Sequence, residues 1–190
     1  MKIVFCGVGA LGSHAALSCR SLGAELVFID FDRVESKNVA SQGYVKPSVG
    51  KNKAEALKAI FANFYGAKAE AFGVRLVETN VDTLLSSADL IVDAFDNKAS
   101  RDILSTYARA KNKPLVHAAV SADGTFGIVR WDERFEADAE DHEGQATCEG
   151  GEHLPMLTLV ASVLSRTIQD FLKSGAKHDA MVSLRSVTPT

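Results

Sequence analysis

Three glycines at a fixed spacing directly follow the first apolar segment of the chain. Residues 2–6 read as a strand that leads into Gly7, Gly9 and Gly12, and a segment of helical period comes next. Missing side chains allow a tight turn, a close approach to phosphate and close packing of helix on strand. Free amides at the helix start favour an anion. This turn predicts a nucleotide or dinucleotide site, with a packing turn in an unliganded protein as the alternative.

Two acids and a lysine continue this series of polar positions. Asp30 ends the second predicted strand, where an acid can accept hydrogen bonds from ribose hydroxyls. Asp32 lies two residues on, on the same face of an extended segment, and Lys53 falls at the start of a helix. Simpler interpretations stay open, since Asp30 could cap a helix or end a solvated strand, and Lys53 could be an ordinary solvated residue.

The elements that must position these residues alternate along the chain. Apolar runs predict strands at residues 2–6, 25–30, 69–74, 89–92 and 114–119, and helical periods predict helices at 10–22, 51–64, 99–110 and 154–172. This alternation is typical of an α/β protein with a mainly parallel sheet covered by helices on both faces. A turn at 122–124 predicts that residues 125–131 return as an antiparallel edge extension, and 181–187 could add a last strand.

Length and charge limit the classes of protein that fit. A chain of 190 residues with 46% hydrophobic residues can bury one core, so we expect a single domain over residues 1–190. An acidic, glycine-containing stretch at about 132–151 lacks apolar periodicity and is expected to be a mobile loop. The net charge of -3 argues against a nucleic-acid partner. No apolar run approaches the roughly 20 residues of a membrane span, so we expect a cytoplasmic protein without membrane contact.

The cysteines and histidines give weaker signals. Cys6, Cys19 and Cys148 are scattered and lack a Cys-x-x-Cys spacing, so neither a disulfide framework nor a zinc site is expected. Cys6 and Cys19 occupy core-facing positions and are expected to be buried. The nearby His142, Cys148 and His153 fit no zinc pattern, and His14 and His117 give no distinct signal.

The ordered motifs resemble those of the ThiF/MoeB/HesA family, the bacterial relatives of ubiquitin-activating enzymes. That family combines a glycine-rich turn with Asp-x-Asp, Ser-Asn-Leu-x-Arg-Gln and Gly-x-x-Lys. Here Asp30 and Asp32, then Asn38 and Gln42, and then Lys53 occupy these positions. The segments 92–101 and 124–129 resemble the family's Asp-Asn-x-x-x-Arg segment and its edge strand, so the resemblance extends over about residues 1–172.

The resemblance implies a Rossmann-like adenylyltransferase. Such a protein uses ATP and Mg²⁺ to activate the C-terminal carboxylate of a ubiquitin-like or sulfur-carrier protein, and a homodimer is expected. By resemblance, Asp30 would hold the ribose, Asn38 and Gln42 would form the loop around the phosphates, and Lys53 would place a cation near them. Asp96 would hold Mg²⁺, which prefers oxygen ligands.

Three further positions of the resemblance carry roles or alternatives. Asn97 follows Asp96 in the nucleotide-binding pair, and Asp96 could instead cap the following helix. Cys148 precedes a predicted helix and resembles the cysteine with which some relatives accept the activated carrier. Glu149 and Glu152 would oppose its ionisation, so a thiol without a covalent role is the alternative.

Two cations of the family pattern have no equivalent here. The family's arginine falls on Ser41, and no residue before the first strand corresponds to the arginine of the family's N-terminal helix. Lys46, Lys51 or Arg101 could substitute, or another chain could supply the charge. Two alternatives to an active enzyme therefore remain. One is a catalytically degenerate member that binds a carrier or partner protein, and the other is an NAD-dependent oxidoreductase.

Overall fold

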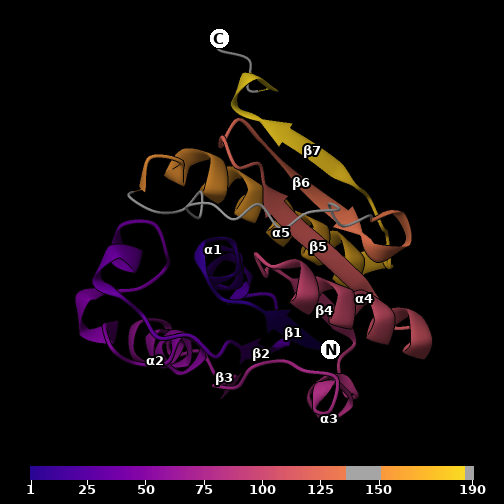
Figure 1. Ribbon diagram of the computed structural model, residues 1–190, viewed down its shortest axis with the longest axis horizontal. Coiled ribbons are helices and arrows are strands. Elements are labelled where there is room, and N and C mark those ends of the chain that lie inside the picture. The colour runs from indigo at the N-terminus through magenta and orange to yellow at the C-terminus, as the bar shows by residue number, and fades with distance from the viewer. Residues whose placement is uncertain (136–150, 187–190) are drawn as a thin grey trace.

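The computed structural model describes residues 1–135 and 151–186, which form one sheet with helices on both faces (Figure 1). The strands are β1 (Lys2–Cys6), β2 (Glu25–Ile29), β3 (Ala69–Phe72), β4 (Leu90–Asp93), β5 (Leu115–Val120), β6 (Phe126–Trp131) and β7 (Ala180–Ser183). The α-helices are α1 (Ala10–Cys19), α2 (Lys53–Tyr65), α3 (Val81–Leu85), α4 (Lys98–Lys111) and α5 (Leu154–Ser174). Short 3-10 turns lie at η1 (Ser36–Ala40), η2 (Lys46–Ser48), η3 (Asp132–Arg134) and η5 (Leu184–Ser186).

The sheet has the order β3-β2-β1-β4-β5-β6-β7. Strands β1 to β5 are parallel, and β6 and β7 pair antiparallel beyond β5 (Figure 1). This confirms the expected mainly parallel sheet with an antiparallel edge extension. The chain leaves β1 toward β2 and β3 and then crosses to β4 on the other side of β1. In such sheets ligands bind at the carboxyl ends of the strands where the direction of winding reverses.

Two apolar cores hold the layers together. One lies between the sheet and α1, α2 and α5, and it includes the edge-to-face contacts of Phe28 with Phe5 and Phe61. The other lies between the sheet and α3 and α4. The strands in the centre are buried on both faces, which explains why their sequences are continuous apolar runs. Within the described residues, no helix is long and apolar enough to cross a membrane.

Several boundaries differ from the predicted ones, and capping explains two of them. Helices α2 and α4 begin at Lys53 and Lys98 because the side chains of Asn52 and Asn97 accept hydrogen bonds from the first-turn amides. Helix α1 ends at Cys19 instead of residue 22. The sequence prediction missed α3, whose five residues are too few to show a helical period.

The C-terminal part of the chain also differs from its prediction. The stretch expected to be a loop from residue 132 begins with the ordered turn η3, in which Asp132 is buried. Residues 136–150 of that prediction lie outside the described part. The final strand ends at Ser183 and continues as the turn η5, so the prediction of a strand over 181–187 was too long.

Candidate functional site

The three glycines after β1 serve two different purposes. A Cβ at Gly7 would lie 2.9 Å from the carbonyl oxygen of Ala94, and Gly7 has φ +85°. A Cβ at Gly12 would lie 2.0 Å from the carbonyl oxygen of Gly7. Gly9, at the N-cap of α1, has no atom of residues 1–135 or 151–186 within 4 Å of the position of its missing Cβ. Gly7 and Gly12 therefore permit close packing, and Gly9 leaves an open approach to the start of α1.

Asp30 supports this turn from the end of β2. Its two carboxylate oxygens accept hydrogen bonds from the amides of Val8 and Asp32, each at 2.9 Å, and the residue is buried. Burial raises the pKa of Asp30, and the Val8 hydrogen bond and the charge of Lys53 oppose this only in part. Asp30 is thus neither a helix cap nor a solvated strand end. Each oxygen keeps a second lone pair for a further donor.

Lys53 is held at the same edge of the sheet. Its Nζ lies 3.1 Å from Oδ2 of Asp32, and its side chain is 11% exposed against 48% for that of Asp32. Asn52 donates to the carbonyl oxygens of Asp30 and Asp32 at 2.8 and 3.1 Å, and the Tyr44 hydroxyl donates to that of Val8 at 2.5 Å. These contacts fix the start of α2 beside the glycine turn, so Lys53 is not an ordinary solvated residue.

The segment from η1 to Tyr44 closes over α1. Asn38 is buried, and its Oδ1 accepts from the amide of Glu35 at 2.8 Å as part of a capping box. The buried Gln42 has a side-chain oxygen without a hydrogen-bond partner among the described residues. Ser41, at the family's arginine position, is buried, and its carbonyl accepts a hydrogen bond from Nε2 of His14 at 3.1 Å. Asn38 therefore shapes the loop, and the side-chain oxygen of Gln42 is an acceptor that the described residues leave free for a ligand.

The turn after β4 packs against the glycine turn through Ala94 and Phe95, which directly precede Asp96 and Asn97. The amide of Ala94 donates to the carbonyl of Cys6 at 2.9 Å, and a Cβ at Gly7 would also meet Phe95. Asn97 accepts from the amide of Ser100 at 2.9 Å and is the cap of α4. The alternative that Asp96 is the cap is therefore wrong. The exposed Asp96 carboxylate has no hydrogen bond or ion pair to residues 1–135 or 151–186.

The cations expected to replace the missing arginine are placed differently from one another. Arg101 donates to the carbonyl oxygens of Phe95 and Ala118 at 2.9 and 3.3 Å, so the structure uses its guanidinium to hold the turn after β4. The prediction that Arg101 could act at the phosphates therefore loses support. Lys46 and Lys51 are exposed on the segment between η1 and α2.

A buried histidine that sequence reasoning passed over lies beneath the same turn. Nδ1 of His117 lies 2.7 Å from Oδ2 of Asp93, and Nε2 lies 3.1 Å from Oδ1 of Asp132. Burial opposes protonation of His117, but the hydrogen bonds to Asp132 and Asp93 outweigh it and raise its pKa. Arg109 pairs with Asp132 at 2.7 Å. The sequence signal that could have identified this pair is an acid, Asp93, at the end of one strand and a histidine, His117, inside the next.

The described cysteines are structural. Cys6 and Cys19 are free thiols buried in the two cores, as expected. Burial, aided by the charge of Asp93, raises the pKa of Cys6, and burial raises that of Cys19 to about 11. Neither thiol is therefore a nucleophile at neutral pH. Cys148 and His142 lie outside the described residues.

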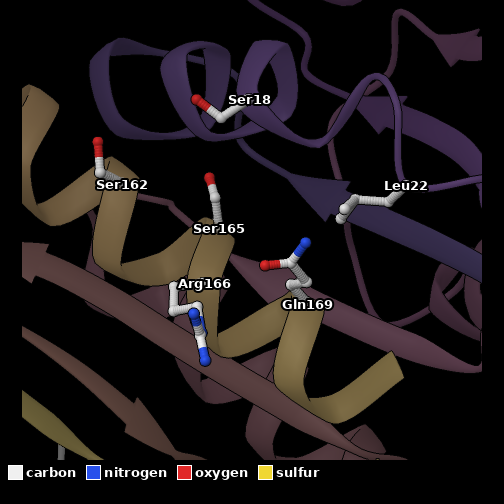
Figure 2. Close-up of a pocket in the computed structure, with 6 residues that line it drawn as sticks. All are labelled: Ser18, Leu22, Ser162, Ser165, Arg166 and Gln169. Carbon is white, nitrogen blue, oxygen red and sulfur yellow. The ribbon is translucent and has the colours of Figure 1, made fainter. Parts of the chain in front are cut away.

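A groove between two helices lies apart from the glycine turn. Within residues 1–135 and 151–186, no cluster of three or more His, Cys, Asp or Glu side chains could hold a metal ion. A shallow groove of about 230 Å³ lies between α1 and α5 (Figure 2), and it is lined by Ser18, Leu22, Ser162, Ser165, Arg166 and Gln169. Its α1 residues lie at or beyond the C-terminal end of the helix, away from Gly9. The groove is therefore separate from the site at the glycine turn.

The fold and the glycine turn define an α/β protein of the Rossmann type. A model of the ThiF family matches residues 1–180, and the chain belongs to this family. It is 33% identical over 122 residues to the SAMP-activating enzyme E1 of Haloferax volcanii and 35% identical over 122 residues to the sulfur carrier protein adenylyltransferase of Thermus thermophilus. Each alignment covers 63% of this chain and 45% of the relative, so the chain spans less than half the length of these curated relatives.

Solved structures show the same fold at lower identity. The structure of E. coli MccB with MccA superposes with a TM-score of 0.80 and 18% identity, covering 98% of this chain and 61% of MccB. The structure of E. coli MccB with ATP gives a TM-score of 0.74 and 18% identity over 96% of this chain and 63% of MccB. These similarities extend the Rossmann-type architecture over almost the whole chain, β6 and β7 included.

Proposed function

We propose that this chain binds ATP at the glycine turn and adenylylates the C-terminal carboxylate of a ubiquitin-like or sulfur-carrier protein. The observation that carries the proposal is the contrast between Gly9 and its neighbours. Gly7 and Gly12 are packed against the protein, whereas the described residues leave the space above Gly9 at the start of α1 open. An opening of this kind admits a phosphate to free amides and to the positive end of the helix dipole. The name of the Thermus thermophilus relative, a sulfur carrier protein adenylyltransferase, agrees with the proposed activity.

The surrounding side chains suit a nucleoside triphosphate. Asp30 can accept from the ribose through its second lone pairs. The side-chain oxygen of Gln42, which has no partner within residues 1–135 and 151–186, offers a second buried acceptor. A buried acceptor without a partner costs about 1–3 kcal/mol, which a ligand hydroxyl or ammonium group would recover. Lys53, oriented by Asp32, would place a positive charge beside the triphosphate.

Asp96 fits the requirements of Mg²⁺ as a protein ligand. Mg²⁺ is usually held by one or two carboxylates together with substrate phosphates and waters. The single exposed carboxylate of Asp96, at a turn that touches the glycine turn, is such a ligand, and no larger cluster is needed. When bound, Mg²⁺ would neutralise charge on the triphosphate and on the departing pyrophosphate.

The proposed reaction needs no proton transfer. A C-terminal carboxylate is ionised at neutral pH, so its oxygen attacks the α-phosphorus of ATP directly. A carboxyl oxygen–phosphorus bond forms, the bond from the α-phosphorus to the bridging oxygen breaks, and pyrophosphate leaves. The protein must align the two reactants and offset negative charge, which positioning and fixed charges accomplish. The thiolate of Cys148 is proposed to attack the carrier's adenylylated carboxyl carbon afterwards, so that a thioester bond forms, the carbon–oxygen bond to the phosphate breaks and AMP leaves.

The proposed setting is a cytoplasmic homodimer. Two buried free thiols suit a reducing compartment. A second chain could supply the positive charge that the family's arginine provides at the position of Ser41. Light scattering of the purified protein measures the oligomeric state, and a monomer at working concentration would contradict the homodimer.

Carrier-dependent exchange of pyrophosphate into ATP tests the proposed function. The purified chain is incubated with ATP, Mg²⁺, labelled pyrophosphate and candidate carriers that end in Gly-Gly. We expect exchange that requires the carrier's terminal carboxylate and disappears when that carboxylate is amidated. Binding of a carrier without exchange would instead support the second candidate, a non-catalytic carrier-binding protein, which the buried Ser41 favours. Calorimetry that shows NAD bound and ATP ignored would favour an oxidoreductase.

A further inference from the structure

A chain of alternating charges runs through the interior beside the turn that carries Asp96. His117 on β5 is 0% exposed and lies between Asp93, the last residue of β4, and Asp132 in η3. Two arginines of α4 close the chain of charges, since Arg101 lies 3.8 Å from Asp93 and Arg109 lies 2.7 Å from Asp132. Five groups of alternating sign thus connect four elements, β4, α4, β5 and η3.

The geometry favours an imidazolium at His117. A carboxylate can only accept hydrogen bonds, and each ring nitrogen faces a carboxylate oxygen, at 2.7 and 3.1 Å. Neutral imidazole has one N–H donor, so the loss of one proton would leave a nitrogen lone pair against a buried carboxylate. The ring of Phe135 stacks on His117 at 3.8 Å and excludes water from that face. Cys6 on β1 is a further titratable group beside Asp93.

The bridge acts on the start of the Asp96 turn. Asp93 accepts from His117 with Oδ2 and from the amide of Phe95 with Oδ1 at 3.0 Å. Arg101 holds the carbonyl oxygen of the same Phe95 at 2.9 Å. The backbone directly before Asp96 is therefore fixed through a carboxylate whose own position depends on His117.

We propose that His117 is a positioning residue for adenylyl transfer, bridging Asp93 and Asp132 so that the turn carrying Asp96 and Asn97 is held against the glycine turn. This inference rests on the proposed function. It assigns a role to a residue that does not touch the nucleotide. A displacement of about 1 Å in a catalytic group can cost up to roughly a hundredfold in rate.

The bridge itself is tested by NMR, without any enzyme assay. The Cε1–H signal of His117, assigned by its absence in His117→Gln, should titrate above the ordinary histidine pKa. The backbone amides of residues 94–97 should shift with the same midpoint. Asp132→Asn removes one charge and should lower both midpoints together. Glu133→Gln is the matched control, because Glu133 lies in the same turn but pairs with Lys177. A neutral His117 at pH 6, or amides that do not follow it, would overturn the bridge.

Exchange kinetics test the catalytic consequence. We expect kcat of the wild type to fall as pH rises through the His117 midpoint, and this decline to move to lower pH in Asp132→Asn. His117→Gln should lower kcat by roughly tenfold or more, with a smaller change in KM for ATP, and should lose the decline. An unchanged kcat and pH profile in folded His117→Gln would overturn the positioning role alone. Wild-type protein without exchange for any carrier would overturn the proposed function together with that role.

Discussion

Substituting alanine at Gly9 and at Gly12 should separate ligand binding from folding. At Gly12 the new methyl would lie 2.0 Å from the carbonyl oxygen of Gly7, although real Cβ contacts stay above 3.0 Å. Helix α1 must then move by about 1 Å, and overpacking of this kind costs about 1–3 kcal/mol. Alanine would otherwise favour a helix by about 1 kcal/mol, so a net loss of stability shows that the contact with Gly7 dominates.

At Gly9 the new methyl meets nothing within 4 Å among residues 1–135 and 151–186. The φ of -70° at this N-cap is ordinary, whereas the ψ of -142° lies outside the regions that L-residues favour. The methyl would, however, occupy the space through which a phosphate reaches the first amides of α1. The affinity for ATP should therefore fall by at least about tenfold, which corresponds to about 1.4 kcal/mol.

Thermal unfolding without ATP and calorimetric titration with ATP measure the two effects separately. For a chain of this size, 1 kcal/mol shifts Tm by about 2–4 °C. With a net loss of up to about 2 kcal/mol, we expect Gly12→Ala to lower Tm by up to about 8 °C, and we expect Gly9→Ala to weaken ATP binding by at least about tenfold. Wild-type affinity in Gly9→Ala, or wild-type stability in Gly12→Ala, would refute the assignment of the two glycines.

Three further predictions concern individual side chains. Lys53→Ala and Asp96→Ala should each abolish detectable pyrophosphate exchange with an unchanged Tm. Lys58→Ala, an exposed control on α2, should exchange normally. Exchange activity in both Lys53→Ala and Asp96→Ala would contradict the assignment of these residues to the site. Cys148→Ser should adenylylate normally but fail to transfer the carrier, as followed by mass spectrometry, and normal transfer would remove the nucleophile role. Burial raises the pKa of Asp132, but hydrogen bonds from His117 and Arg109 outweigh it and lower the pKa to about 2. Its stabilisation is therefore complete above the unfolded pKa of about 4 and is lost as pH falls toward 2, so the stability difference between wild type and Asp132→Asn, measured by urea unfolding, should shrink in that range.

Much of the site could be predicted because its parts are local in sequence. The glycine turn follows β1, and Asp30 and Asp32 follow β2. The single unit β1–α1–β2 therefore brings them together. The roles of individual residues were less predictable. Either Asp96 or Asn97 could cap α4 from its position, and only the backbone geometry shows that Asn97 does so.

The spacing of residues along the chain by itself determined the parallel α/β class and the glycine turn after β1. It also determined the order of motifs that resemble the ThiF family, whose model matches residues 1–180. Local periodicity is sufficient for this because strands and helices differ in the repeat of their apolar positions. The tertiary structure alone decided that Gly9 is open while Gly12 is packed, and that His117 meets Asp93 and Asp132. Those contacts depend on the register between β4, β5 and β6, which is set by packing across the sheet and leaves no repeat in the sequence.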